Sequence, residues 1–382
     1  MSTNGSDALL EVFSQVPLRF CRGQGSRLWT EDGREFVDFY GGHAVALLGH
    51  GHPAVVQAIG DQASRLIFQS NLFPLEVREE AARDLRAFAG LSSHRVFFVN
   101  SGAEANENAL RIALRATGRS TVVRMEGSFH GRTAAAAAVT EGAREKWYGF
   151  PNTPFPVRRV ALEDLGGLER AIDQDTAAVI LEPVQGVAGA RDLSATFLRA
   201  ARDLTRRHGA LLIADEVQCG MGRCGVPFVS VDLGLDPDLL TVGKGLAGGL
   251  PGAAVLVSEA LARGLRPGDL GTTFGGGPVV CAAIRAVIRA IEQDHLLERV
   301  QRLSARIDAE CRRGPVLGVQ GQGFLKGLRT RRPASEVLAG LRERGILAGG
   351  SGDPQVVRLL PPLVLDDADV DRLRDALEEM ES

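Results

Sequence analysis

Short apolar runs alternate along most of this chain with longer stretches that have helical spacing. The apolar runs, bounded by polar residues or glycine, are typical of buried strands and lie at Thr121–Met125, Ala177–Val184, Leu211–Ala214 and Leu239–Val242. The amphipathic stretches between them predict helices at Ser101–Thr117, Leu165–Ile172 and Ala195–Arg207. This alternation predicts an α/β fold in which a mostly parallel sheet carries helices on both faces.

The two ends of the chain have a different pattern. Polar and apolar residues alternate around Asp32-Gly33, which predicts a β-hairpin, and Pro53 is expected to begin a helix that reaches about Phe68. After Pro278 the pattern predicts long helices at 279–293 and 296–312 and short strands at 323–328 and 356–360. We therefore expect an N-terminal segment (1–50) that joins a small α+β domain (259–382), and a large α/β domain (51–258).

Composition narrows the class of protein only a little. The chain has 382 residues with 45% hydrophobic and 24% charged side chains, and its formal net charge of −3 gives no electrostatic footprint for nucleic acid or an anionic membrane. No run approaches the ~18 apolar residues of a membrane span, and the N-terminus does not resemble a signal peptide. Five scattered cysteines without a CxxC pair predict free thiols in a reducing cytoplasm.

Two buried strands end in ionisable residues, Asp215 and Lys244. The carboxyl ends of parallel strands form the edge where open α/β sheets bind ligands. A carboxylate and an amine at one edge suit pyridoxal 5'-phosphate, whose aldehyde condenses with a lysine and whose ring nitrogen takes an acidic partner. The alternative is an ion pair that only holds two strands together.

A further candidate site lies where Ser101-Gly-Ala-Glu opens a helix. Ser101 and Glu104 fit a capping box, and Gly102 would let backbone amides approach an anion at the helix N-terminus. The alternative is a capped helix without a ligand. The glycines at 245–252 follow their lysine and do not form a phosphate-binding P-loop. His50 and His52 flank a single glycine with no carboxylate beside them in the sequence, so we do not expect a metal site there.

Other polar or aromatic residues follow the same strands. Phe129 could stack on a planar ring, and Arg132 could bind a carboxylate with both guanidinium branches. A core phenylalanine and a solvated arginine are the alternatives. Glu182 ends another strand at this edge. Arg358 is a lone cation in an apolar strand, paired either inside the protein or with a ligand carboxylate.

Together these motifs resemble the class III, ornithine-type aminotransferases in order and spacing, from about Phe20 to the end of the chain. The motifs that carry the resemblance are Asn100-Ser-Gly-Ala-Glu-Ala-Asn-Glu, Phe129-His-Gly-Arg, Glu182-Pro-Val-Gln-Gly, Asp215-Glu-Val-Gln-Cys-Gly-Met-Gly-Arg, Lys244 after Leu-Thr-Val-Gly, and Gly271-Thr-Thr-Phe-Gly-Gly. Within that class the chain is most similar to acetylornithine aminotransferases and to their sister enzymes, which act on lysine precursors attached to an amino-group carrier protein.

The resemblance implies a fold-type-I transferase with a seven-stranded sheet and a pyridoxal 5'-phosphate site. Lys244 would bind the cofactor aldehyde and move protons, and Asp215 would face the ring nitrogen. Gln218 would bond the ring hydroxyl, and Phe129 would cover the ring face. The other residues implied at the cofactor are Ser101, Gly102 and Ala103 at the phosphate, Thr273 from the partner subunit of a homodimer, and Glu216 and Val217 beside Asp215.

The resemblance also implies a substrate side of the site. Arg132 would bind the α-carboxylate of the amino donor, with Thr272 in the same pocket, and Arg358 would bind the α-carboxylate of glutamate. Glu182 and His43 are expected beside the substrate. Three positions depart from the family: Val187 replaces a glutamate that pairs with the arginine at Arg358, His43 replaces an apolar residue or tyrosine, and Gly277 replaces an asparagine.

The sequence thus predicts a transaminase that moves the distal amine of N2-acetylornithine to 2-oxoglutarate. Two alternatives remain open: transfer from carrier-linked lysine or another ω-amine, and a non-catalytic protein that kept the fold as an interaction module.

Overall fold

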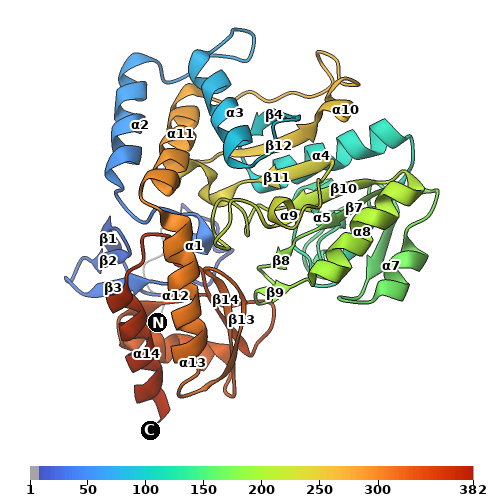
Figure 1. Ribbon diagram of the computed structural model, residues 1–382. Coiled ribbons are helices and arrows are strands. Elements are labelled where there is room, and N and C mark those ends of the chain that lie inside the picture. The colour runs from blue at the N-terminus through green and yellow to red at the C-terminus, as the bar shows by residue number, and fades with distance from the viewer. Residues whose placement is uncertain (1–7, 382) are drawn as a thin grey trace.

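A computed structural model describes residues 8–381 of the chain, and its centre is a seven-stranded sheet (Figure 1). The order of its strands is β4 (His94–Val99), β12 (Ala253–Ser258), β11 (Leu239–Val242), β10 (Leu211–Asp215), β7 (Thr176–Leu181), β5 (Thr121–Met125) and β6 (Val157–Val160). Only β12 runs antiparallel to its neighbours. The sequence prediction of a mostly parallel seven-stranded sheet is confirmed.

Helices cover both faces of this sheet, because successive strand residues point to opposite sides. Val122 packs with α4 on one face, whereas Val123 packs with α7 and α8 on the other. The helices and turns of this region are α4 (Gly102–Thr117), α5 (Ala134–Ala138), α6 (Ala143–Lys146), α7 (Leu165–Ala171), α8 (Ala195–His208), α9 (Val229–Asp232), the 3₁₀ turn η1 (Lys244–Ala247) and α10 (Glu259–Ala262). A small hairpin, β8 (Val184–Gln185) and β9 (Arg191–Asp192), follows β7.

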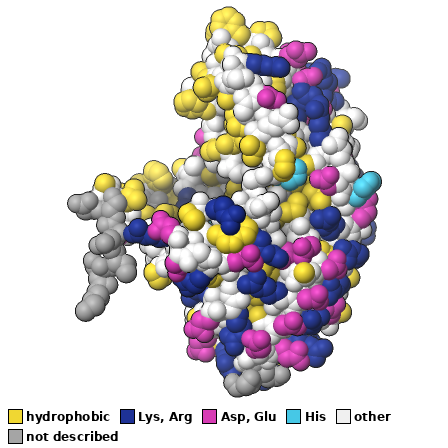
Figure 2. All heavy atoms as spheres, turned by 90° about the vertical axis from the view of Figure 1, so that its left-hand side faces the viewer, with side chains coloured by type: hydrophobic (Ala, Val, Ile, Leu, Met, Phe, Trp, Pro, Cys, Tyr) yellow, Lys and Arg dark blue, Asp and Glu magenta, His cyan; other side chains and the backbone are white. Residues whose placement is uncertain are grey.

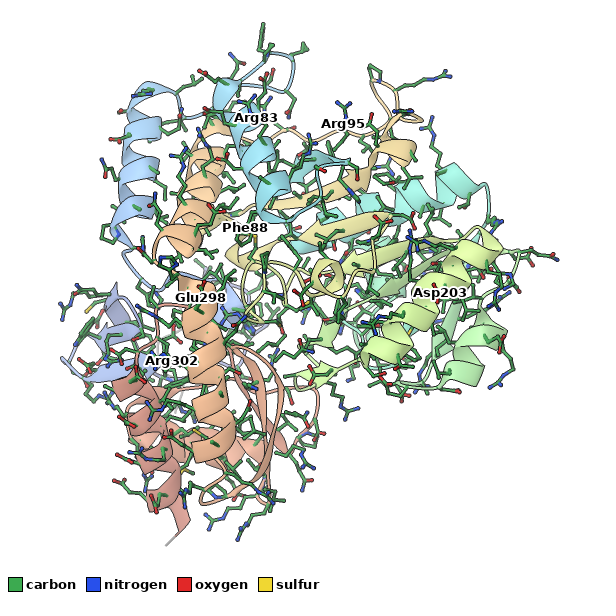
Figure 3. All side chains as sticks on the ribbon, viewed as in Figure 1. Arg83, Phe88, Arg95, Asp203, Glu298 and Arg302 are labelled. Atoms are coloured by element: carbon green, nitrogen blue, oxygen red, sulfur yellow. The ribbon has the colours of Figure 1, made fainter. Side chains whose placement is uncertain are left out.

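Three further helices pack beside the sheet: α2 (Pro53–Arg65), α3 (Glu76–Phe88) and α11 (Pro278–Gln293). Phe88 points from α3 into the core, where its ring centroid lies 6.2 Å from that of Phe228, while Arg83 on the opposite face is exposed (Figure 3). This spacing of apolar and charged residues is what the amphipathic pattern of α3 requires.

The remaining elements form the lower part of the molecule in Figure 1. They are β1 (Phe20–Gln24), β2 (Arg27–Thr30), β3 (Glu35–Asp38), the turn α1 (Gly41–Ala44), α12 (Leu296–Glu310), β13 (Val316–Gln322), β14 (Leu325–Thr330), α13 (Ala334–Glu343), β15 (Ile346–Leu347), β16 (Val356–Leu359), α14 (Asp367–Glu378) and η2 (Glu379–Glu381). The N-terminal strand β3 pairs with β15 near the other end of the chain. The division into three parts at residues 50 and 258 stays a prediction.

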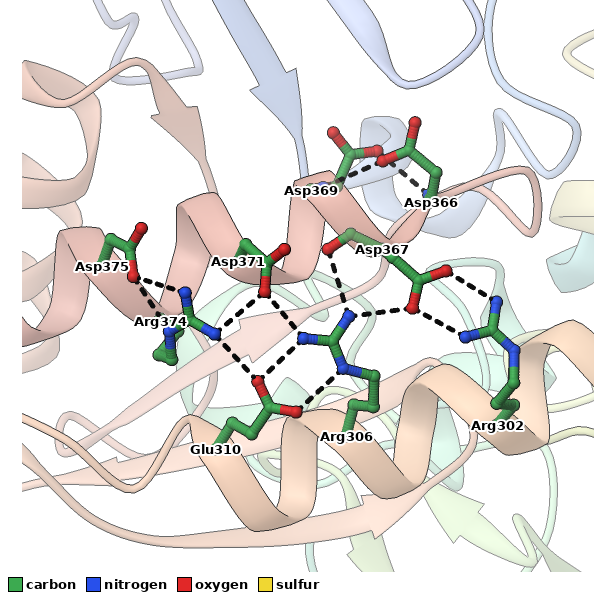
Figure 4. Close-up of polar contacts among 9 residues, drawn as sticks. All are labelled: Arg302, Arg306, Glu310, Asp366, Asp367, Asp369, Asp371, Arg374 and Asp375. Atoms are coloured by element: carbon green, nitrogen blue, oxygen red, sulfur yellow. Dashed lines mark hydrogen bonds and ion pairs between the residues drawn. The ribbon is translucent and has the colours of Figure 1, made fainter.

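Charged side chains join α12 to α14 along their outer faces (Figure 4). Arg306 donates to Glu310 at 2.8 Å, to Asp367 at 2.8 Å and to Asp371 at 2.7 Å. Arg374 extends the network from α14 to Glu310 at 3.2 Å. The hydrogen bonds from Arg302 first, and those from Arg306 second, lower the pKa of Asp367 to about 2.

Several boundaries differ from the sequence prediction. The helix from Pro53 ends at Arg65, three residues before Phe68, and the stretch Ala177–Val184 is divided between β7 and β8 by Glu182 and Pro183. The prediction of no signal peptide rests on residues 1–7, which lie outside the described residues. Between residues 8 and 381, none of the helices combines the length and the apolar composition that crossing a membrane requires.

Candidate active site

Asp215 and Lys244 lie at the carboxyl ends of the neighbouring strands β10 and β11. Asp215 is opposite Thr241 in the parallel register, and Lys244 follows β11 as the first residue of η1. Asp215 is 2% exposed, whereas Lys244 is half-buried, with its amine end enclosed by protein. Lys244 has a φ of 46°, a left-handed conformation that is unusual for a residue with a Cβ and that is found most often at functional sites.

Burial is the main influence on the amine of Lys244. It lowers the pKa of Lys244, although the charges of Asp215 and Glu182 act in the opposite direction. Removing an ammonium from water disfavours its charged form more than these two carboxylates favour it. In a larger fraction of the protein molecules, Lys244 therefore carries a neutral amine, which can act as a nucleophile or accept a proton.

Asp215 is held by three hydrogen-bond contacts. Its Oδ2 accepts from Asn106 Nδ2 at 2.7 Å and lies 2.7 Å from His130 Nδ1, and its Oδ1 accepts from the amide of Val217 at 3.0 Å. Asn106 and His130 are themselves buried. The carboxylate is therefore fixed in orientation, as a group that must meet a defined partner requires.

Glu182 is the second buried carboxyl group at this edge. It accepts from the amide of Phe129 at 2.9 Å and from the amide of Gly186 at 3.4 Å. Burial raises the pKa of Glu182 to about 7, and the nearby Asp215 adds to the rise, while His130 and Lys244 oppose it. Glu182 thus exchanges a proton near neutral pH, which is the range a general acid or base needs.

The N-terminus of α4 lies beside the residues that precede Lys244. Ser101 caps the helix by accepting from the amide of Glu104 at 3.2 Å, which confirms the predicted capping box. A Cβ on Gly102 would lie 2.6 Å from Val217 Cγ1, and one on Gly243 would lie 3.4 Å from the Gly102 amide nitrogen. A side chain on Gly102 would collide with Val217, so glycine is required at that position, whereas the 3.4 Å distance at Gly243 is an ordinary contact.

Arg358 brings a cation to the same place from β16. It is 5% exposed, and it donates to Gln218 Oε1 at 3.3 Å and to the Gly350 carbonyl at 2.6 Å. Among the residues that the structure describes, no carboxylate lies within ion-pair distance of Arg358. Burial is the main cause of the lowered pKa of Arg358.

Tyr40 and His43 lie near this arginine. The Tyr40 hydroxyl lies 2.8 Å from His43 Nε2, and the rings are 4.6 Å apart. His43 belongs to a left-handed turn, with a φ of 64°. Burial, and after it the charges of Arg358 and Lys244, lower the pKa of His43, so that the imidazole beside them favours its neutral form.

Other predicted residues make contacts of their own outside this pair. Arg132 is exposed, with its guanidinium 5.1 Å from the centre of the Trp147 ring. Thr272 Oγ1 accepts from the Gly275 amide at 3.0 Å, and Thr273 beside it is exposed. The carboxylate of Glu216 accepts instead from helix α9, at the amides of Val229 and Ser230 and at the Ser230 hydroxyl.

Sequence reasoning did not single out Asn106 and His130. Both lie inside motifs that were recognised, yet their side chains were assigned no task. A signal existed for Asn106: it is a polar residue on the helix face that also carries Ala105 and Ala109, which pack against the sheet. A buried amide requires hydrogen-bond partners, and the strand ends are the nearest source of them.

A half-buried amine, two buried carboxyl groups and a helix N-terminus therefore share one edge of the sheet. A sequence model described as Aminotransferase class-III matches residues 12–380 of the chain. The chain belongs to this family. This match confirms the resemblance found in the motifs. The chain therefore has the class-III fold and is a transaminase.

Individual members of the class-III family agree with this result. The chain is 41% identical over 382 residues to an acetylornithine aminotransferase of Methanopyrus kandleri, covering 97% of this chain and 95% of the relative. It is 42% identical over 368 residues to an acetylornithine aminotransferase of Mycobacterium tuberculosis, with coverages of 95% and 91%.

Solved structures show the same architecture. The acetylornithine aminotransferase of Elizabethkingia anophelis has a TM-score of 0.86 at 29% identity, covering 97% of this chain and 95% of its own. The ornithine aminotransferase of Toxoplasma gondii, whose active site holds pyridoxal phosphate at partial occupancy, has a TM-score of 0.91 at 29% identity, with coverages of 98% and 91%. The predicted fold-type-I class is confirmed.

Proposed function

We propose that this class-III aminotransferase uses pyridoxal 5'-phosphate to move the distal amine of N2-acetylornithine to 2-oxoglutarate, giving N-acetylglutamate 5-semialdehyde and glutamate. The observation that carries the proposal is the position of the Lys244 amine beside the buried acids Asp215 and Glu182 at the end of β11, in a chain whose relatives are named acetylornithine aminotransferases.

The residues at this edge fit the cofactor. Pyridoxal 5'-phosphate supplies an aldehyde for a lysine amine, a ring that withdraws electrons, and a phosphate. Lys244 offers the amine, and Asp215 offers a fixed carboxylate for the ring nitrogen. The amides of Gly102 and Ala103, next to Ser101, open helix α4 and suit the phosphate, because a helix N-terminus carries partial positive charge.

Each protein group then has a separate task. Lys244 would hold the cofactor, and its amine, whose lowered pKa favours the neutral form, would take and return the substrate proton. Phe129 would cover the ring, and Gln218 would bond the ring hydroxyl. Glu182, with a pKa of about 7, holds or releases a proton beside them. Val217 supports Asp215 through its amide.

Two arginines divide the recognition of carboxylates. Arg358 is buried and has only neutral hydrogen-bond acceptors among the described residues, so a substrate carboxylate would give it the partner that a buried cation requires. Arg132 is exposed and would bind the α-carboxylate of the donor, with Thr272 and His43 lining the pocket. The neutral Tyr40–His43 pair supplies a polar wall without a further charge.

We also propose that the active unit is a homodimer, with Thr273 serving the phosphate of the partner subunit. The support is an exposed apolar ridge on the loop between α2 and α3 and on the loop of Thr273. Figure 2 shows apolar side chains gathered at the top of the face that carries α2. The residues of the ridge are Leu66, Ile67, Phe68, Leu72, Phe73 and Phe274, each at least 39% exposed.

The two loops of this ridge are joined to each other. The Asn71 amide donates to the Thr272 carbonyl at 3.1 Å and to the Gly275 carbonyl at 3.3 Å, and the Phe68 and Phe274 rings lie 5.5 Å apart. Light scattering should find a dimer. Mixing Lys244→Ala chains with Thr273→Ala chains should restore part of the lost activity, whereas a fully active monomer would contradict the shared site.

A panel of amines assayed with 2-oxoglutarate tests the reaction, with glutamate formation as the measurement. N2-acetylornithine should be the best small donor, and Lys244→Ala should form no glutamate and bind no cofactor covalently after borohydride reduction. Preference for lysine on an amino-group carrier protein would instead assign the chain to the sister enzymes. No glutamate with any donor would support a non-catalytic protein.

A further inference from the structure

A single buried amide connects the three elements that build the active site. Asn106 lies on the inner face of α4 and is 1% exposed. Its Nδ2 donates to Asp215 Oδ2 at 2.7 Å and to the His130 carbonyl at 2.7 Å. Both hydrogens of the Asn106 amide are therefore used, one by the Asp215 carboxylate at the end of β10 and one by the His130 carbonyl.

The other end of this amide is held by Thr241. The Thr241 hydroxyl donates to Asn106 Oδ1 at 2.7 Å, and Thr241 is fully buried, three residues before Lys244. The Asp215 carboxylate and the His130 carbonyl can only accept, so the amide nitrogen of Asn106 must face them and its oxygen must face Thr241. The Thr241 hydroxyl, which could donate or accept, therefore donates here and holds the oxygen end of the amide.

This arrangement leaves the two oxygens of Asp215 in different environments. Oδ2 meets both Asn106 and His130 at 2.7 Å, whereas Oδ1 accepts only the Val217 amide at 3.0 Å. A carboxylate oxygen has two acceptor sites. Oδ1 therefore keeps one site for a further donor, and the bonds to Oδ2 prevent the carboxylate from turning.

We propose that Thr241 and Asn106 are positioning residues that hold Asp215 so that Oδ1 receives the ring N–H of pyridoxal 5'-phosphate. The relay acts through Asp215 and does not touch the cofactor ring, and it rests on the role proposed above for Asp215. It links the strand that leads to Lys244, the helix that opens at the phosphate, and the strand that ends in the acid.

The test compares two cofactors that differ in one atom. In 1-deazapyridoxal 5'-phosphate a CH group replaces the ring nitrogen, so the contact with Asp215 is lost while the aldehyde and phosphate remain. Dissociation constants of both compounds are measured by equilibrium dialysis against apoprotein. The unsubstituted protein should bind the natural cofactor about tenfold or more tightly than the analogue, since a hydrogen bond to a charged group is of that strength.

Thr241→Val keeps the shape of the side chain and removes the hydroxyl, and Thr241→Ser is the matched control that keeps it. The preference is the ratio of the two dissociation constants. Thr241→Val and Asn106→Leu should each lower it, so that a preference of about tenfold for the natural cofactor becomes about threefold or less. Binding of the deaza analogue should stay within about twofold. Thr241→Ser should keep the preference of the unsubstituted protein.

Each outcome has a distinct meaning. If Thr241→Val weakens both compounds equally, or changes neither, the relay is only structural and the proposal is overturned. If the unsubstituted protein binds the two compounds equally, Asp215 does not bond the ring nitrogen. The role proposed for Asp215 is then wrong, and the proposal for Thr241 and Asn106 is wrong with it. Should Asn106→Leu not fold, the comparison between Thr241→Val and Thr241→Ser alone decides the question.

Discussion

Replacing Glu182 by glutamine should make the apoprotein more stable at alkaline pH and change its stability little at acidic pH. Burial raises the pKa of Glu182 from 4.5 to about 7, which corresponds to about 3 kcal/mol at ~1.4 kcal/mol per pKa unit. The folded protein therefore binds a proton at this site that the unfolded chain has already released. The resulting contribution is fully present below pH 4.5, declines as pH rises, and is lost above about pH 7.

Glu182→Gln removes this titration while keeping one carbonyl acceptor for the Phe129 amide, which bonds Glu182 at 2.9 Å. Urea denaturation of both apoproteins between pH 5 and pH 8.5 measures the effect. The free energy of unfolding of the variant should exceed that of the unsubstituted protein by up to about 3 kcal/mol at pH 8.5 and by less than about 1 kcal/mol at pH 5.

Glu141→Gln is a control with the opposite sign. Burial raises the pKa of Glu141, but the bond and charge of Arg124 and the amide of Gly127 outweigh it, so the pKa is lowered. This variant should therefore be less stable by a nearly constant amount between pH 5 and pH 8.5, because a lowered pKa loses its contribution only as pH falls below about 4.5. Equal pH dependence in the Glu182→Gln variant and the unsubstituted protein would refute the reasoning, because it would mean that Glu182 does not titrate in this range.

Three further predictions concern other parts of the molecule. Gly186→Ala should raise KM for 2-oxoglutarate about tenfold or more, because the added Cβ would overlap the Gln218 amide that accepts from Arg358; unchanged steady-state kinetics would contradict it. Val187→Glu should give Arg358 a carboxylate partner, slow the half-reaction with glutamate and restrict transfer from free ornithine to the distal amine; product analysis of ornithine turnover decides. Arg306→Gln should lower the melting temperature in 50 mM salt, with a smaller loss in 1 M salt, because its three acidic partners are on the surface (Figure 4).

The parts that sequence predicted are those whose signal is local. Leu211–Asp215 and Leu239–Val242 were found as strands because a central strand of a parallel sheet is buried on both faces and is therefore apolar throughout. A charged residue directly after such a run must lie at the edge of the sheet. That reasoning placed Asp215 and Lys244 together without any knowledge of the helices.

The contacts that sequence did not predict depend on distant parts of the chain. Arg358 reaches Gln218, 140 residues earlier, only because β16 pairs with β14 beside the large sheet. Neighbouring residues can also diverge: Asp215 faces Asn106, while Glu216 turns toward α9, as successive side chains at the end of a strand do. The face that each residue presents is set by packing, which the local pattern leaves open.

The two buried acids of the site are held by unequal numbers of hydrogen bonds. Asp215 meets three donors at 3.0 Å or less, two of them supplied by the side chains of Asn106 and His130. Glu182 has only two backbone amides, one of them at 3.4 Å. Burial is the main cause of the raised pKa of Glu182, and these few hydrogen bonds do not offset it. The Thr241–Asn106 relay therefore separates a fixed acceptor from an acid that titrates near pH 7.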